Sequence, residues 1–288
     1  MKNIQLTCAH AIIKFLTKQK IYINGKKEPL FPGAFGIFGH GNVACLGQAL
    51  EENKKELPTW RGHHEQNMAL TGIAFSRAKR RKQIFIATSS VGPGSTNMLT
   101  AAAVAMSNRL PMLFLPGDTF ANRMPDPVLQ QVEHFNNPNI TQNDAFKYVT
   151  RYFDRITRPE QIIQSLPQAI QTMIDPADCG PACISLSQDV QGEVFEYPEE
   201  FFEEQIHTIR RPRPDDFQIK LAADLIKKSK NPIIISGGGI FYSDATNELS
   251  EFAKKHNIPT AQTVMGYSTM KKDDPYFLGA IGGLGGKN

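Results

Sequence analysis

Short apolar runs alternate with amphipathic segments along residues 1–190. Apolar residues recur with a helical period from Leu6 to Leu16, and Thr7 is a suitable N-cap, so this segment is predicted to be a helix. Further helices are predicted over residues 43–53, 68–78 and 95–107, and from Arg158 onward. The apolar runs with the length of buried parallel strands are Gly33–Phe38, Ile84–Ala87, Pro111–Pro116 and Pro181–Leu186.

The order of these elements predicts an α/β domain over residues 1–190, built on a doubly wound parallel sheet. In such sheets the ligand binds beyond the carboxyl ends of the strands. His40, the stretch Ser89 to Asn97, and Gly117-Asp118 all follow predicted strands. These residues are therefore the first candidates for a binding site.

Composition changes after residue 190. Residues 191–216 are rich in charged residues and proline, which is typical of a linker between domains. A second α/β pattern follows, with helices predicted over 217–228 and 247–256 and strands over 232–236 and 260–264. Two or three strands cannot close a doubly wound sheet, so residues 217–288 are expected to be a truncated second α/β domain and the chain a fragment of a longer protein.

At 288 residues, 41% hydrophobic and 21% charged, the chain has the composition of a globular protein. The net charge of +4 is small and the densest basic run, Lys79 to Lys82, suits a helix C-terminus, so we expect no nucleic-acid partner. Neither a membrane-spanning apolar stretch nor a signal-peptide pattern occurs in the sequence, so we expect no membrane partner. Cysteines inside apolar segments are typical of buried thiols in a reducing compartment, which predicts a cytoplasmic protein: Cys8, Cys45, Cys179 and Cys183.

The candidate chemistry begins with Glu65, which opens an Ala-rich predicted helix. A carboxylate in the first helical turn has a structural explanation, because it complements the positive end of the helix dipole. His63, His64 and Gln66 surround it with more polar groups than capping requires. This segment therefore indicates a possible site without establishing one.

A second stretch, Gly92-Pro93-Gly94-Ser95-Thr96-Asn97, follows a predicted strand and starts a helix. Backbone N–H groups at such a start can bind an anion or a polar ligand. The turn Gly39 to Ala44 fits the loose dinucleotide pattern G-x-G-x-x-A, but the acidic residue expected about twenty positions later is missing. A nicotinamide-dependent oxidoreductase therefore stays only an alternative, and a tight strand-to-helix turn explains these glycines better.

Together, the Glu65 and Gly92–Asn97 stretches resemble a motif pair of the thiamine diphosphate (ThDP) enzymes. Acetohydroxyacid synthase-like members carry a similar His-Glu-Gln-Gly and a similar Gly-Pro-Gly-Ala-Thr-Asn in their N-terminal, pyrimidine-binding domain. The resemblance extends from Leu6 to Val190 and on into the start of the family's middle domain. Asn67 departs from the family pattern, which generally has Gly after Glu-Gln.

The resemblance implies a catalytic and cofactor-binding role for Glu65, whose carboxyl would hydrogen-bond the ring nitrogen of the aminopyrimidine. This contact favours the tautomer whose exocyclic nitrogen removes the proton from C2 of ThDP. Gly92, Pro93 and Asn97 would belong to the cofactor-binding turn, Asn97 mainly by supporting it.

Two further catalytic candidates are His40 and Gln130. The resemblance places Gln130 near the reacting centre, in a segment expected to be a loop followed by a helix after Pro125-Asp126-Pro127. His40 would polarise a carbonyl or relay a proton, and a turn histidine bonded to the backbone is an equal alternative.

The family holds the diphosphate through Mg²⁺, using a Gly-Asp-Gly motif followed later by Asn. No Gly-Asp-Gly occurs in this sequence, so the Mg²⁺ ligands are expected in a C-terminal domain beyond it and no metal ligands within it. The family's active site forms between two subunits. A full-length homo-oligomer, dimer or tetramer, is therefore expected, whereas the fragment alone is expected to be inactive and to expose an apolar face.

Three further stretches look closer to one branch of the family: Phe35–Val43, Arg123–Gln131 and Arg151–Ile156. They resemble the trihydroxycyclohexane-dione hydrolases of myo-inositol catabolism, which open a cyclic 1,2-diketone with water. The implied function is hydrolytic cleavage of a C–C bond in this small-molecule substrate. A 2-oxo acid carboligase or decarboxylase and a non-catalytic interaction fragment remain the alternatives.

Overall fold

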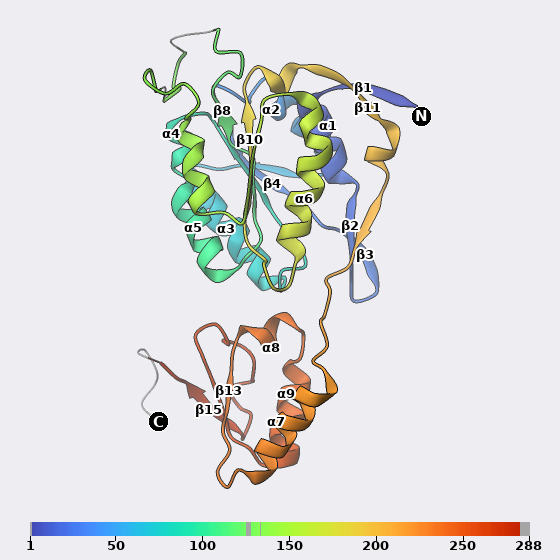
Figure 1. The fold of residues 1–288 in the computed structure, drawn as a ribbon, viewed down its shortest axis with the longest axis vertical. Helices are drawn as coiled ribbons and strands as arrows, with labels where there is room; N and C mark the ends of the chain where they lie inside the picture. The colour runs from blue at the N-terminus through green and yellow to red at the C-terminus, as the bar shows by residue number, and fades with distance from the viewer. Residues whose placement is uncertain (1, 125–127, 133, 283–288) are drawn as a thin grey trace. The chain divides into compact units, whose positions relative to one another are not determined.

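The computed structural model describes residues 2–124, 128–132 and 134–282. The chain divides into two compact units, Met1–Arg210 and Arg211–Asn288 (Figure 1). The strands of the first unit are β1 (Asn3–Thr7), β2 (Gln19–Ile23), β3 (Lys26–Pro29), β4 (Ala34–Ile37), β5 (Thr59–Arg61), β6 (Ile86–Ser89), β7 (Leu113–Phe114), β8 (Gly117–Asp118), β9 (Tyr152–Ile156), β10 (Ala182–Ser187), β11 (Val194–Pro198) and β12 (Gln205–His207). Its α-helices are α1 (Cys8–Thr17), α2 (Leu46–Glu52), α3 (Glu65–Ala78), α4 (Pro93–Thr96), α5 (Leu99–Asn108) and α6 (Ile162–Ile174).

The central sheet of the first unit has the order β5-β4-β6-β7-β10, with β9 on the other side of β10, and these pairings are all parallel. Strands β7 and β8 pair with successive parts of β10, so they form one strand that is interrupted at Leu115 and Pro116. The chain runs from β4 out to β5 and then returns to β6 on the opposite side of β4. This reversal between β4 and β6 is the kind of switch point where doubly wound sheets bind ligands. The predicted fold class is confirmed.

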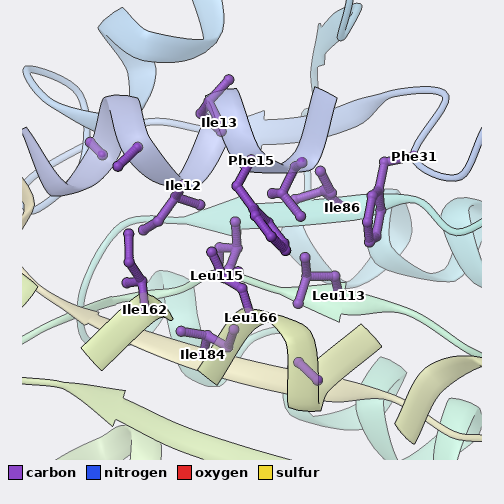
Figure 2. Close-up of a cluster of buried hydrophobic side chains, with 14 of the residues drawn as sticks. Ile12, Ile13, Phe15, Phe31, Ile86, Leu113, Leu115, Ile162, Leu166 and Ile184 are labelled. Atoms are coloured by element: carbon purple, nitrogen blue, oxygen red, sulfur yellow. The ribbon is translucent and has the colours of Figure 1, made fainter. Parts of the chain in front are cut away.

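Helices α1 and α6 lie on one face of the sheet, and α3 and α5 lie on the other (Figure 1). Under α1 and α6, buried side chains of both helices meet those of β6, β7 and β10 (Figure 2). Ile12 and Phe15 come from α1, Leu166 comes from α6, and Ile86 and Ile184 come from the strands; each is at most 1% exposed. Full burial of one such side chain stabilises the fold by roughly 1.5–3 kcal/mol, so this layer fixes the sheet whose edge carries the site.

Local sequence signals set the ends of several elements. The Thr7 hydroxyl accepts a hydrogen bond from the backbone N–H of His10, which confirms the predicted N-cap of α1. Helix α3 begins at Glu65 itself, three residues before the predicted range. The helix predicted over residues 95–107 is two helices, because α4 ends at Thr96 and α5 starts at Leu99.

The segment predicted as a linker, residues 191–216, belongs largely to the first unit. Strand β11 pairs antiparallel with β1 at the start of the chain, and β12 pairs parallel with β2. The boundary between the units therefore follows Arg210. The charge and proline content of this segment suggested a linker. Its two strands were missed because their partner strands lie far away in the sequence and leave no local signal.

The prediction of a helix after Gln130 is wrong for the described residues. Residues 128–132 and 134–141 form turns and loops, and the next helical segment is the 3₁₀-helix η1 (Gln142–Tyr148). Pro125-Asp126-Pro127, on which part of this prediction rested, lies outside the described residues.

The second unit contains α7 (Asp216–Lys228), β13 (Ile234–Ser236), α8 (Gly238–Tyr242), α9 (Thr246–His256), β14 (Thr260–Gln262) and β15 (Phe277–Ala280). Its strands form a three-stranded parallel sheet in the order β13-β14-β15. Leu249, Ala253 and Met270 form its small buried cluster. Among the described residues, no helix of either unit is long and apolar enough to cross a membrane.

Candidate active site

The predicted site residues come together at the switch point between β4 and β6. His40 follows β4, Glu65 is the first residue of the helix after β5, and the Gly92–Asn97 bend follows β6. Because β4, β5 and β6 are parallel neighbours, their carboxyl ends lie at the same edge of the sheet. Residues that are far apart in the sequence thus face one region.

Glu65 is held against the bend by Asn97. The side-chain N–H of Asn97 donates a hydrogen bond of 2.7 Å to Oε2 of Glu65. The other carboxylate oxygen, Oε1, lies 3.4 Å from the position that a Cβ on Gly94 would occupy. Glu65 is half-buried and sits at the positive end of α3. The carboxylate is therefore fixed beside the bend with one oxygen oriented by a donor.

The glycines of the bend are required by close contacts. Gly92 has a φ of +71°, and a Cβ at this position would lie 1.8 Å from the backbone oxygen of Gln130. A Cβ at Gly94 would lie 2.5 Å from the Ser90 hydroxyl oxygen. No larger residue fits at Gly92 without moving backbone.

His40 and Gln130, the two other catalytic candidates, contact each other. Nδ1 of His40 lies 3.2 Å from Oε1 of Gln130, a hydrogen bond in which the protonated ring nitrogen donates. Gln130 has a φ of +64°, a left-handed conformation that costs a non-glycine residue about 1–2 kcal/mol. Two contacts accompany this conformation: the Gln130 carbonyl packs against Gly92, and the Gln130 side chain reaches His40.

An open pocket of about 560 Å³ collects these groups, and it is lined by Glu65, Ser90, Pro93, Gly94, Thr96, Asn97 and Gln130. His40 lines a neighbouring pocket with residues of the Gly39–Cys45 turn. The structure therefore brings Glu65, Pro93, Asn97 and Gln130 to one pocket, and His40 contacts that pocket's lining through Gln130. His63 and His64, which precede Glu65, are exposed and do not line the pocket.

The residues present fit the aminopyrimidine half of ThDP. A carboxylate oriented by Asn97 borders the pocket, and the backbone of the bend at Pro93 and Gly94 lines it. No group of three or more His, Cys, Asp or Glu side chains suited to a metal ion occurs within the described parts of the chain.

The glycine turn after β4 supports the site. Gly41 has a φ of +106°, and Asn42 donates hydrogen bonds of 2.7 Å to the Thr88 hydroxyl and to the Ser89 carbonyl. The turn therefore ties the end of β4 to the end of β6. This structural account explains the glycines that suggested a dinucleotide site.

Asp118 does not face the pocket. Although it is the last residue of β8, at the same edge of the sheet, it is fully buried and accepts hydrogen bonds from Arg155 and Ser185. The sequence did not predict this pairing, and the only signal for it was the polar strand Tyr152–Ile156, which carries Asp154 and Arg155.

Comparison with known proteins now adds to this geometry. The family profile described as "Thiamine pyrophosphate enzyme, N-terminal TPP binding domain" matches residues 32–139, and that of the family's "central domain" matches residues 219–288. The chain belongs to the thiamine pyrophosphate enzymes. The first match contains the whole candidate site, and the second coincides with the second unit.

Members of this family resemble the chain over nearly its full length. The 3D-(3,5/4)-trihydroxycyclohexane-1,2-dione hydrolase of Geobacillus thermodenitrificans is 48% identical over 285 residues, which cover 99% of this chain and 45% of that protein. The enzyme of the same name from Clostridium tetani is 49% identical over 285 residues, covering 99% and 44%. The chain thus spans less than half the length of these curated relatives.

A solved thiamine pyrophosphate enzyme shares the fold. The thiamine diphosphate-dependent 4-hydroxybenzoylformate decarboxylase of Rhodococcus jostii RHA1 superposes with a TM-score of 0.77 over 96% of this chain and 48% of its own, at 17% sequence identity. At this identity the similarity shows the fold alone. The family assignment displaces the nicotinamide-dependent alternative for the Gly39–Ala44 turn.

Proposed function

We propose that this chain forms the pyrimidine side of the ThDP site in a hydrolase that cleaves a C–C bond of a cyclic 1,2-diketone. The observation that carries the proposal is the Glu65 carboxylate, held by Asn97 beside the glycine bend in a thiamine pyrophosphate enzyme domain. The choice of substrate rests on the similarity to dione hydrolases over 99% of the chain.

ThDP, when bound, supplies the nucleophilic carbon and the electron sink of the reaction. The chain's own residues bind and orient. Glu65 would hydrogen-bond the ring nitrogen of the aminopyrimidine, and Asn97 holds the carboxylate in a fixed orientation for this contact. Pro93 and Gly94 of the bend line the pocket and would border the ring.

On the substrate side, we assign proton relay or carbonyl polarisation to His40, with Gln130 orienting its imidazole. Cleavage between the two carbonyls of a cyclic 1,2-diketone by water leaves one carboxylate and one aldehyde in the same chain. A proton must therefore move to the carbon that becomes the aldehyde. Gln130 lines the Glu65 pocket and contacts His40, which lines the neighbouring pocket, so the pair is placed to carry out such a transfer.

We further propose that the diphosphate and Mg²⁺ bind in the part of the relatives' length that this chain does not span, and that the active site is completed by a second subunit in a homo-oligomer. On this proposal the chain alone would lack activity, because it would carry only the pyrimidine side of the site. We place the protein in the cytoplasm because all four cysteines are free thiols, and three of them are buried.

Proton exchange tests the role of Glu65. In the full-length enzyme, we expect Glu65→Gln to slow exchange of the C2 proton of bound ThDP at least about a hundredfold, the size typical of acid–base catalysis. The measurement is deuterium exchange followed by acid quench and NMR. Glu56→Gln, on an exposed turn, is the control and should exchange as the parent does. Unchanged exchange in Glu65→Gln would refute the assignment.

A substrate comparison tests the reaction class. The full-length enzyme should consume trihydroxycyclohexane-1,2-dione and leave pyruvate unchanged, as followed by NMR of the products. Turnover of pyruvate in place of the dione would identify a 2-oxo acid carboligase or decarboxylase instead. If the enzyme consumed neither substrate but still showed C2 proton exchange that depends on Glu65, the cofactor assignment would stand and the dione would be wrong as the substrate.

A further inference from the structure

A second cavity lies at the same sheet edge but over different strands. It has a volume of about 360 Å³ and lies at the carboxyl ends of β8, β9 and β10, where Thr119, Thr157 and Ser187 line it. It shares no lining residue with the Glu65 pocket within the described parts of the chain. Carboxyl ends of parallel strands are where this class of sheet binds ligands, and the proposed ThDP chemistry does not use this end.

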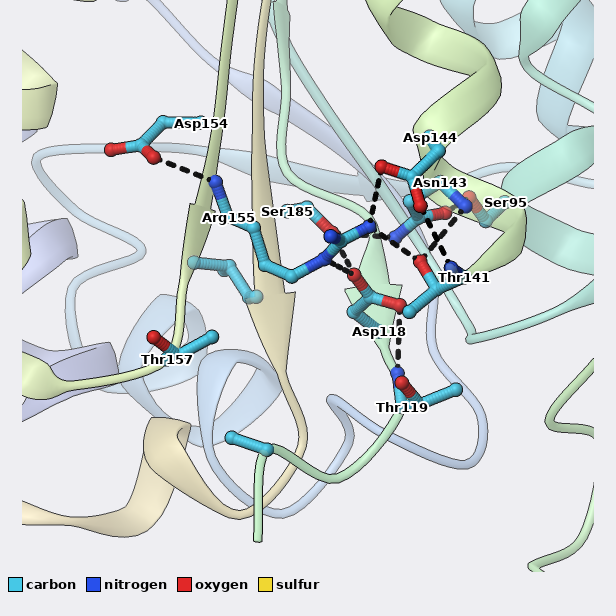
Figure 3. Close-up of polar contacts among 12 residues, drawn as sticks. Ser95, Asp118, Thr119, Thr141, Asn143, Asp144, Asp154, Arg155, Thr157 and Ser185 are labelled. Atoms are coloured by element: carbon cyan, nitrogen blue, oxygen red, sulfur yellow. Dashed lines mark hydrogen bonds and ion pairs between the residues drawn. The ribbon is translucent and has the colours of Figure 1, made fainter. Parts of the chain in front are cut away.

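Arg155 is fixed at the wall of this cavity. Its Nε donates to Asp118 over 2.8 Å, and its second terminal nitrogen donates to the Thr141 hydroxyl over 2.8 Å and lies 3.1 Å from Asp144 (Figure 3). Asp118 is itself held by the Ser185 hydroxyl and by the backbone N–H of Thr119. The guanidinium side chain, 19% exposed, is therefore preorganised at the cavity.

The other lining groups favour a negative ligand. The described lining residues include no Asp or Glu. The two carboxylates on Arg155 offset its charge. Arg123, in contrast, donates to a neutral partner, Asn139, and adds a positive charge to the lining. The side-chain nitrogen of Gln131 is buried and donates no hydrogen bond within the described residues. An unpaired buried donor of this kind costs about 1–3 kcal/mol and is satisfied by a ligand or water.

Size and shape restrict the ligand further. Thr119, Thr141, Thr157 and Ser187 add hydroxyl groups to the cavity, while apolar side chains such as Phe120 and Ile140 provide a surface for carbon atoms. A volume of this order accommodates a single small metabolite, at the lower end of ligand pockets. The lining therefore matches a molecule that has hydroxyl groups and one anionic group.

We propose that this cavity binds a small hydroxylated organic anion and that binding steadies the neighbouring Glu65 site through Gln130. Gln131 lines the cavity, while Gln130 lies in the Glu65 pocket with its carbonyl against Gly92 and its side chain on His40. An occupant that bonds Gln131 restricts the next peptide unit, and Gln130 already holds a left-handed backbone. Binding of the anion does not depend on the proposed reaction. The effect of that binding on the Glu65 pocket does rest on the proposed function, because it concerns the same site.

Matched sugars test the binding step. D-Glucuronate differs from D-glucose by a carboxylate in place of a hydroxymethyl group. Glucose 6-phosphate tests whether a phosphate can replace the carboxylate as the anionic group, and inorganic phosphate tests whether the anion alone is enough. We expect calorimetric titration of the 288-residue chain to show binding of glucuronate or glucose 6-phosphate and none of glucose. Equal binding of glucose, or no binding of either anion, overturns the proposal. If inorganic phosphate bound as tightly as glucose 6-phosphate, the cavity would recognise phosphate alone, and the proposal of a hydroxylated ligand would be wrong.

Variants place the anion in this cavity. Arg123→Gln and Gln131→Leu should each weaken binding at least about fivefold, since each removes a charged or unpaired donor. Arg151→Gln is the control, because Arg151 precedes β9 and lies at the opposite edge of the sheet. Circular dichroism and thermal melting check that each variant is folded. Unchanged affinity in both cavity variants would locate the anion elsewhere and contradict the assignment.

The imidazole of His40 reports the coupling. Its NMR signals should shift when glucuronate is added to the parent chain and should stay in place in Gln130→Ala with the cavity intact. Shifts of equal size in Gln130→Ala would overturn the coupling through Gln130, whatever the affinity. Because this readout needs neither ThDP nor turnover, its failure is distinct from failure of the proposed reaction.

Discussion

Single side chains at the bend set the geometry of the candidate site. Glu65 opens α3 and Asn97 follows α4, and their 2.7 Å hydrogen bond joins two segments that leave different strands. Gly92 permits the close approach of Gln130, which in turn reaches His40. Each of these contacts depends on one residue, so each can be tested by one substitution.

Replacing Asn97 should weaken cofactor binding without unfolding the protein. In the full-length enzyme, Asn97→Ala removes the donor to Glu65 and should raise the Kd of ThDP about ten- to a hundredfold, the effect of one hydrogen bond to a charged group. Fluorescence titration measures the Kd. Asn108→Ala, at the last residue of α5, serves as the control. Equal Kd values for both variants would show that Asn97 does not orient Glu65.

Gly92→Ala should destabilise the first unit by about 3 kcal/mol or more, because it combines left-handed strain with a clash against the Gln130 carbonyl. Gly25→Ala is a matched control. Gly25 also has a positive φ, +77°, but its Cβ would meet nothing within 4 Å, so only strain of about 1 kcal/mol is expected. Urea unfolding measures both. If the two variants lost similar amounts of unfolding free energy, the Gln130 carbonyl would be able to move away from the new Cβ at little cost.

At the scale of elements, a buried polar network connects the bend to the far strands. The hydroxyl of Ser95 in α4 donates to the side chain of Asn143 in η1. Asn143 donates to the Gly117 carbonyl over 2.9 Å and to the Ser185 hydroxyl in β10 over 2.7 Å (Figure 3). The short helix α4 is therefore tied to η1 by Ser95, and Asn143 extends this contact to β8 and β10.

Loss of Asn143 should be costly. Asn143→Ala leaves buried groups on Ser95, Gly117 and Ser185 with fewer partners, and we expect the free energy of unfolding to fall by about 2–4 kcal/mol. Chemical denaturation measures the change. Asn137→Ala, on an exposed turn, should change it by less than about 0.5 kcal/mol. Equal effects of the two would argue that the network does not hold α4.

At the scale of the whole molecule, the second unit leaves apolar surface uncovered. Helix α7 buries none of its residues, and Phe217 is 75% exposed. Phe217, Leu221 and Leu225 recur every four residues, so they form one apolar stripe. An exposed stripe of this kind is a surface for association, in agreement with the sequence-based expectation of an exposed apolar face.

The stripe predicts self-association of the 288-residue chain. The double variant Leu221→Lys/Leu225→Lys should weaken association at least about tenfold, because it removes apolar area and adds like charges. Sedimentation velocity over a range of concentrations measures it. Gln218→Lys, on the same exposed helix, is the control and should associate as the parent does. Identical behaviour of both variants would exclude α7 as the contact surface.

The sequence by itself determined the alternation of strands and helices, the Thr7 cap, and the candidate residues at strand ends. These features follow from local periodicity and from residue chemistry, which act over a few neighbouring positions. The two motifs with Glu65 and Gly92 also sufficed to indicate the family that the profiles confirm.

Only the tertiary structure decided the long-range partners. Asp118 pairs inward with Arg155, β11 pairs with β1, and Gln130 packs on Gly92. Each contact joins positions tens of residues or more apart, and no local pattern encodes which distant group fills a given space. Burial and close packing select among the possible partners once the sheet has assembled. The fold therefore sets the geometry of the site, whereas the sequence sets which chemical groups it contains.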